Sequence, residues 1–133
     1  MNPTHIEHIG IAVKSLEESI PIFESLLGVK CKSIEIVVDQ HVKTAIFEVG
    51  INKIELLETT DPDGPIGSFL TKQGEGIHHI AFAVEDADET LQQAKNNGFK
   101  LIDRVSRKGA EQMNIGFLNP KSTNRVLIEF CSK

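Results

Sequence analysis

Two histidines and two glutamates stand at matching places in the two halves of this chain of 133 residues. His8 begins the run His-Ile-Gly-Ile-Ala-Val, and His79 begins His-Ile-Ala-Phe-Ala-Val 71 positions later. Glu55 and Glu129 lie in later strand candidates and are separated by 74 positions. Two imidazoles and two carboxylates in one cavity suit a divalent first-row metal ion that keeps positions open for water or substrate. The pattern therefore predicts one divalent metal ion held by these four side chains.

The surroundings of the two glutamates bear on this interpretation. Glu55 lies within Lys-Ile-Glu-Leu-Leu and Glu129 within Val-Leu-Ile-Glu-Phe. A carboxylate in so apolar a strand is either exposed or paired, because burying an unpaired charge is very costly. A single strand histidine is usually a core or edge residue, and a single strand glutamate is usually exposed. The recurrence of both residue types in each half favours the metal site over these simpler interpretations.

Strand periodicity distinguishes His79 from its neighbour His78. With a period of two residues, His79 shares a face with the small residues Ala81 and Ala83. His8 has the same kind of small-residue face, and small side chains leave room for an ion and a ligand. His78 lies on the opposite, bulky face and is predicted to be a packing residue.

Other titratable residues lack this recurrence. His5 and His41 are expected at the surface or at the edge of a substrate site, because neither has a counterpart in the other half. The remaining glutamates near these segments are expected to be solvated: Glu7, Glu58 and Glu75.

Two copies of a β-α-β-β-β unit are predicted to position the four candidate ligands. Ser15 and Asp86 each precede a helical pattern as N-cap residues with an acid three positions on, and Gly28 and Gly98 end the helices. Further strands are expected at 29–36, 42–49, 53–58, 99–105, 113–118 and 125–130, with a short helix at 66–72. The fold class is α+β, in a single domain over 1–133 with module one at about 5–60, a linker at about 61–75 and module two at about 76–133.

Composition restricts the partners and the compartment. The formal net charge is −5 and the pI is about 5.5, which argues against nucleic-acid binding. Cys31 and Cys131 have neither metal-motif spacing nor the density of a disulfide scaffold, which is typical of a reducing compartment. No apolar run has the length of a membrane span or of a signal region. We therefore expect a cytoplasmic protein with no nucleic-acid or membrane partner.

The tandem unit resembles the vicinal oxygen chelate superfamily, which includes glyoxalases, bleomycin resistance proteins and dioxygenases. Within it, the sequence looks most like the methylmalonyl-CoA epimerases. The segments that carry this resemblance are 8–13, 53–58, Pro-Ile-Gly-Ser-Phe-Leu at 65–70, Gly-Glu-Gly-Ile-His-His-Ile-Ala-Phe at 74–82 and Phe-Leu-Asn-Pro-Lys-Ser at 117–122. The resemblance implies a cupped, barrel-like mixed sheet formed by two modules around a metal.

The resemblance also implies an activity. It would be a 1,1-proton transfer that interconverts the epimers of methylmalonyl-CoA, a small CoA thioester, through a metal-stabilised enolate. The ion would be Co, Zn, Ni, Mn or Mg. Glu129 is the first candidate for the catalytic base, and Glu55 is the symmetric candidate. Relatives in the superfamily are often dimers, so a homodimer is expected.

The sequence departs from the epimerase pattern in three places. Asn119 replaces a usual histidine, and Arg125 replaces a common glycine. Thr44 stands where some members have a carboxylate that acts as one of the two bases, so the second proton-transfer residue is left unassigned. Two alternatives stay open: a glyoxalase I-type lactoylglutathione lyase, and a metal-free drug-binding protein of the same fold.

Overall fold

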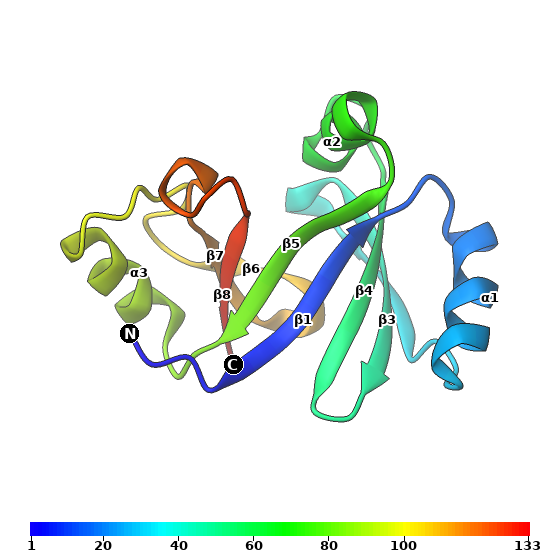
Figure 1. Ribbon diagram of the computed structural model, residues 1–133, viewed down its shortest axis with the longest axis horizontal. Helices are drawn as coiled ribbons and strands as arrows, with labels where there is room; N and C mark the ends of the chain where they lie inside the picture. Colours follow the sequence, from blue (N-terminus) through cyan, green and yellow to red (C-terminus); the bar gives the residue numbers. More distant parts are fainter. The chain divides into compact units, whose positions relative to one another are not determined.

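The computed structural model describes residues 1–133, whose contacts divide into two compact units. Unit 1 comprises Met1–His8 and His79–Lys133, and unit 2 comprises Ile9–His78. Within unit 2, β2, β3 and β4 are antiparallel neighbours, and within unit 1 the strand order is β5-β8-β7-β6, with a parallel β5–β8 pair and antiparallel β8–β7 and β7–β6 pairs (Figure 1). Along the chain, β-α-β-β-β occurs twice with one extra helix between the copies. The predicted α+β class and mixed sheet are therefore confirmed.

Unit 2 begins with the second part of β1 (His5–Ala12) and continues into α1 (Leu16–Leu27). The Ser15 side chain accepts a hydrogen bond from the Glu18 amide, and Gly28 ends the helix with a left-handed φ of 68°. Both ends of this helix agree with the prediction, because the cap residues satisfy backbone groups that the helix leaves free. The helix continues through Pro21.

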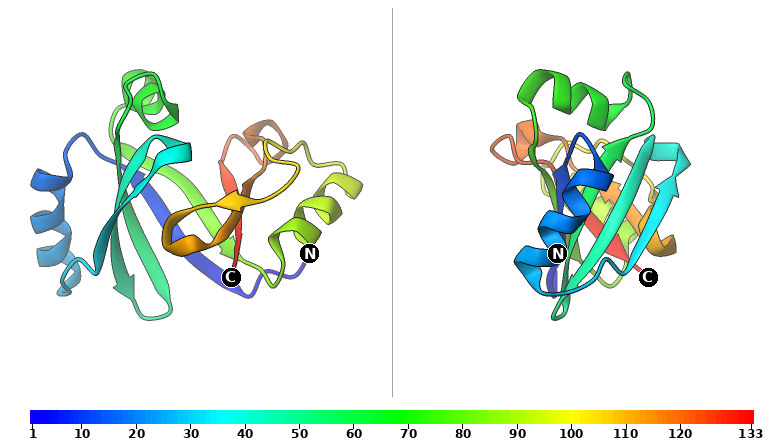
Figure 2. Two further views of the ribbon diagram at one scale, coloured as in Figure 1. Left: turned by 180° about the vertical axis from the view of Figure 1, so that it is seen from behind. Right: turned by 90° about the vertical axis from the view of Figure 1, so that its right-hand side faces the viewer.

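Three antiparallel strands follow in unit 2: β2 (Ser33–Val37), β3 (Val42–Val49) and β4 (Asn52–Thr59). A short 3-10 turn, η1 (Val38–Gln40), connects β2 to β3, and α2 (Pro65–Gln73) precedes β5. Helix α1 packs on β3 and β4 through an apolar cluster that contains Leu16, Phe47 and Leu56 (Figure 2). This packing holds β4, the strand that carries Glu55.

Unit 1 contains most of β5 (Gly76–Ala83), α3 (Ala87–Asn96), β6 (Arg107–Lys108), β7 (Asn114–Phe117) and β8 (Ile128–Ser132). The 3-10 turns η2 (Ala110–Gln112) and η3 (Pro120–Ser122) lie between the later strands. Asp86 caps α3 by accepting from the Glu89 amide, as the sequence predicts. None of the helices has the length and apolar character that a membrane span requires.

Helix α3 covers β7 and β8, and it comes closest to the sheet where Leu91 meets Gly116. Leu91 is fully buried, and a Cβ on Gly116 of β7 would lie 2.5 Å from Leu91 Cδ1. Only glycine allows the helix this near to the strand, because any side chain would overlap the leucine. This contact fixes the distance between β7 and α3. Strand β7 is in turn the antiparallel neighbour of β8, which carries Glu129.

The strand predicted at 99–105 is wrong. The amides of Ile102 and Asp103 both donate to the carbonyl of Phe117, at 2.9 and 3.2 Å, so a regular ladder does not form. Only an isolated bridge, Leu101 to Leu118, and the two-residue strand β6 occur in this region.

Two other strand starts also differ from the prediction. Residues 29–32 lie outside β2: the Lys32 amide still donates to Ile46 of β3 (2.8 Å), but the Cys31 amide donates to the Glu24 side chain (2.9 Å). Strand β8 begins at Ile128, since Arg125 has a left-handed φ of 67° and bonds back to Pro120.

Candidate metal site

Three of the four predicted ligands come together in unit 1. The Nε2 atoms of His8 and His79 lie 3.0 Å apart. The carboxylate of Glu129 lies 3.4 Å from each imidazole, with Oε2 near His8 Nε2 and Oε1 near His79 Nε2. The exposed fractions of the three residues are 5%, 5% and 2%. Two imidazoles and a carboxylate therefore face one another where little water reaches them.

The strand pairing of unit 1 explains this convergence. Ala81 of β5 pairs with Glu129 of the parallel strand β8. His79 lies on β5 two residues before Ala81, so it is close to Glu129 across the strand pair. On the other side, Phe117 of β7 pairs with Glu129. The Phe117 ring also contacts His79 edge to face, with a centroid separation of 5.6 Å. The small Ala81 and the flat Phe117 ring leave the histidine and the glutamate room to meet.

The spacing of these atoms fits a bound cation. Two ligand atoms that each lie about 2.0–2.2 Å from one ion are about 2.8–3.6 Å apart at octahedral or tetrahedral angles. The three distances of 3.0, 3.4 and 3.4 Å fall within this range. Imidazole nitrogen and carboxylate oxygen together are a donor set that first-row divalent ions accept. The residues present therefore fit the predicted ion.

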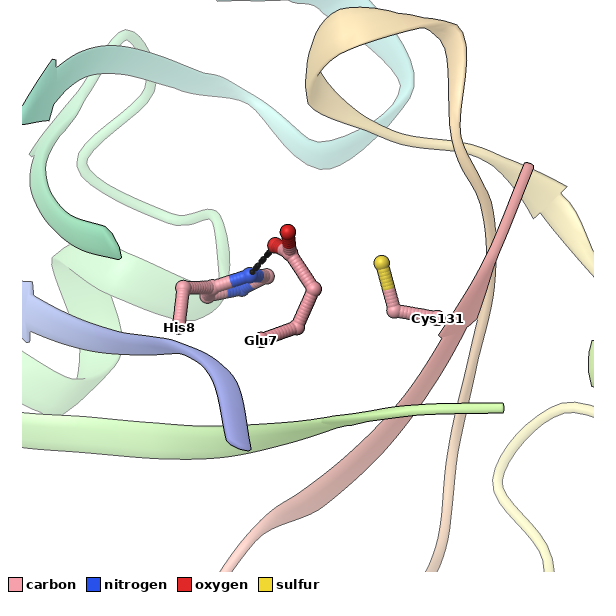
Figure 3. Close-up of side chains that lie close together, drawn as sticks. All are labelled: Glu7, His8 and Cys131. Carbon is pink, nitrogen blue, oxygen red and sulfur yellow. Dashed lines mark hydrogen bonds and ion pairs between the residues drawn. The ribbon is translucent and has the colours of Figure 1, made fainter. Parts of the chain in front are cut away.

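Glu7 is the residue that sequence reasoning placed wrongly. It was predicted to be solvated, but it is only 7% exposed, and its Oε1 lies 2.7 Å from Nδ1 of His8. Figure 3 shows the Glu7 carboxylate between the His8 imidazole and the Cys131 side chain. These three residues also offer ligand atoms that all lie within 4.8 Å of one another. Strand alternation separates Glu7 from His8, so periodicity alone gave no sign of the contact.

Cys131 was also missed as a neighbour of the site. It is 1% exposed, and neither Cys31 nor Cys131 is in a disulfide. The available signal was its spacing, because Cys131 follows Glu129 by two residues and so shares its face of β8.

Glu55, the fourth predicted ligand, lies in unit 2. It is on β4 opposite Ile46 of β3 and is 6% exposed, so it is not one of the solvent-facing strand glutamates. Thr44 is on the neighbouring strand β3, opposite Leu57, and is 2% exposed. The inclusion of Glu55 in the metal site stays a prediction.

The other histidines have different surroundings. The His78 ring packs edge to face on Phe69 at 5.1 Å, and burial lowers the pKa of His78 to about 4. His5 is half-buried and contacts the Thr4 hydroxyl at 2.9 Å, whereas His41 is exposed.

Of the other two glutamates predicted to be solvated, Glu58 accepts from the Leu16 amide and Glu75 accepts from the Lys14 amide, each at 2.8 Å.

Residues 7–117 match the Glyoxalase/Bleomycin resistance protein/Dioxygenase superfamily, and the chain belongs to this superfamily. Among its relatives, the chain is 41% identical to the Uncharacterized protein YqjC of Bacillus subtilis, over 95% of this chain and 90% of the relative. It is 32% identical to the mitochondrial methylmalonyl-CoA epimerase of Dictyostelium discoideum, over 96% and 78% of the two chains.

The similarity extends to three dimensions. A solved structure of methylmalonyl-CoA epimerase in complex with methylmalonyl-CoA and NH4+ matches with a TM-score of 0.96. The two sequences are 31% identical, and the match covers 99% of this chain and 96% of that one. The chain is therefore similar to epimerases in both sequence and fold.

Proposed function

We propose that this protein is a metal-dependent epimerase that interconverts the two epimers of methylmalonyl-CoA. The observation that carries the proposal is the buried meeting of His8, His79 and Glu129, in a chain similar to methylmalonyl-CoA epimerases over nearly its whole length. Fold alone is shared by several activities, so the donor set at the site is the stronger support.

The proposed cofactor is one divalent ion, of Co, Zn, Ni, Mn or Mg, held by His8, Glu55, His79 and Glu129. When bound, such an ion would act as a Lewis acid on the thioester and carboxylate oxygens of the substrate. The protein residues orient the site and exclude water from it, because the three ligands in unit 1 are almost fully buried. Exclusion of water strengthens every charge interaction within the site.

The chemical step is a proton transfer at the carbon between the thioester and the carboxylate. The C–H bond breaks, its electron pair moves toward the thioester oxygen, and a carboxylate takes up the proton. We assign this duty first to Glu129 and symmetrically to Glu55. Inversion requires a proton to return on the opposite face, so a second group must donate it. Thr44 carries a hydroxyl where some superfamily members have a carboxylate, and a hydroxyl has no basic form near neutral pH.

Solvent-deuterium incorporation tests the proposal. In D2O, purified metal-loaded protein should introduce deuterium at the α-carbon of methylmalonyl-CoA, detected by mass spectrometry. Formation of lactoylglutathione, assayed in parallel, would support the glyoxalase I alternative instead. Absence of both activities and of bound metal would favour the metal-free binding protein.

Assembly and location are part of the same proposal. The strand order ends with β2 and β6, and edge strands are commonly protected by a partner. Ile34 and Ile36 of β2 are 50% and 64% exposed, which suits an apolar homodimer contact. Two cysteines that form no disulfide suit a reducing compartment, and we propose the cytoplasm.

A further inference from the structure

We infer that Glu7 is a positioning residue whose carboxylate fixes the tautomer and direction of the His8 imidazole, an inference that rests on the metal site of the proposed function. Glu7 is adjacent to His8 in the sequence, but it is not one of the four proposed ligands. Glu7 would affect ion binding only by orienting His8.

The contact between the two side chains determines the tautomer. An ionised carboxylate can only accept hydrogen bonds. Because Glu7 Oε1 lies 2.7 Å from His8 Nδ1, the proton of a neutral His8 imidazole belongs on Nδ1. The other nitrogen, Nε2, then keeps its lone pair. That lone pair faces His79 at 3.0 Å and Glu129 at 3.4 Å.

Burial makes this contact persistent. Glu7 and His8 are 7% and 5% exposed, so water competes little for the hydrogen bond. The Cys131 side chain lies on the side of Glu7 opposite His8 (Figure 3) and belongs to an apolar cluster with Ile115 and Phe117. The same strand, β8, thus carries the proposed ligand Glu129 and the Cys131 side chain beside Glu7.

The consequence for ion binding follows from histidine chemistry. A metal ion binds the unprotonated nitrogen of a neutral imidazole, and the hydrogen bond at the other nitrogen decides which one that is. Losing such an outer carboxylate typically lowers metal affinity about 10- to 100-fold. Glutamine keeps an oxygen that can accept from Nδ1, whereas alanine removes the acceptor. Comparison of Glu7→Gln with Glu7→Ala therefore shows the effect of losing the hydrogen-bond acceptor, because Glu7→Gln keeps both the acceptor and the size of the side chain.

The first measurement needs no metal. Long-range 1H–15N NMR spectra of the metal-free protein at pH 8 report which His8 nitrogen carries a proton. We expect a protonated Nδ1 in the wild type and in Glu7→Gln, and a shift toward protonated Nε2 in Glu7→Ala. A wild-type His8 protonated on Nε2 alone, or an unchanged tautomer in Glu7→Ala, would overturn the inference.

The second measurement is the affinity for Co²⁺, from competition with a chelator. Glu7→Ala should bind about 10- to 100-fold more weakly, and Glu7→Gln should recover most of the loss. Glu85→Ala removes an exposed carboxylate of unit 1 and serves as the control that should bind as the wild type does. The thermal unfolding midpoint of each metal-free variant verifies that the fold is retained.

The two measurements separate failure of the inference from failure of the proposed function. If the wild type binds no divalent ion while the His8 tautomer still depends on Glu7, the metal site is wrong and the tautomer assignment stands. If the wild type binds Co²⁺ and Glu7→Ala binds it equally well, Glu7 has no positioning duty.

Discussion

The Nε2 atoms of His8 and His79 lie 3.0 Å apart although 71 residues separate the two histidines in the sequence. The rings meet edge to face, with an interplanar angle of 87°. Two unprotonated nitrogens at this distance would repel each other, so the arrangement requires either a shared proton or a shared cation. The adjacent carboxylate of Glu129 favours positive charge at this point.

Removal of one imidazole should therefore remove the ion. We expect His79→Ala to lose most bound metal, because His79 provides one of the two nitrogen donors. His78→Ala should keep most of it, since the His78 ring packs on Phe69. Metal content after gel filtration, by inductively coupled plasma mass spectrometry, distinguishes the two. Stoichiometric metal in the double variant His8→Ala, His79→Ala would show that the site lies elsewhere.

Replacing Glu129 by glutamine should separate ligation from proton transfer. The amide oxygen of Glu129→Gln can still coordinate an ion, although more weakly, but the amide cannot take up a proton at the working pH. Loss of a general base costs about 10²- to 10⁴-fold in rate. The variant should retain metal and lose deuterium incorporation into methylmalonyl-CoA by that factor.

The same change at Glu55 tests whether the two halves of the chain supply equivalent groups. Glu55→Gln should likewise slow deuterium incorporation if this carboxylate is the second base. If one of the two variants still incorporates deuterium, the carboxylate replaced in it serves only as a metal ligand. Exchange near the wild-type rate in both variants would place the bases on other residues, with His41, Glu48 and Glu111 next to be replaced.

The protein should form a symmetric homodimer in solution. Edge strands and their exposed apolar residues are commonly covered by a second copy, and closed symmetric dimers are the most frequent oligomers. Sedimentation velocity at micromolar concentration should give a mass of about two chains. A monomer as the only species would reject this expectation, and Ile34→Lys on β2 should shift the equilibrium toward monomer if that strand lies in the interface.

Gly67→Ala should destabilise the protein although it lies in helix α2. Alanine is favoured over glycine in helices by about 1 kcal/mol. A Cβ at this position, however, would overlap the backbone carbonyl of Pro62, which is not a flexible side-chain end. We expect a net loss of about 1–3 kcal/mol in the free energy of unfolding.

Gly76→Ala is the matched control for that change. Nothing lies within 4 Å of a Cβ at Gly76, and its φ is not left-handed. Urea denaturation should show this variant near the wild-type midpoint, with Gly67→Ala clearly lower. Equal midpoints for the two variants would mean that the loop at Pro62 moves aside at little cost.

Local sequence determined the elements whose signals are short-range. The caps at Ser15 and Asp86 place the starts of α1 and α3 correctly, because a capping side chain bonds amides within its own first turn. The recurrence of His8 and His79, with the apolar setting of Glu129, identified the three residues that meet in unit 1. Repetition carries this information because each half folds as the same β-α-β-β-β unit.

Tertiary structure alone decided the features that depend on which backbone groups meet across the sheet. The segment predicted as a strand at 99–105 fails because two amides bond to one Phe117 carbonyl, a choice that no local pattern encodes. Glu7 lies one residue from His8 and should point away from it by strand alternation, yet its long side chain reaches Nδ1. The carboxylate is buried there because His8 pairs with it and the Cys131 strand lies on the other side, and both partners are available only once β1, β5 and β8 are assembled.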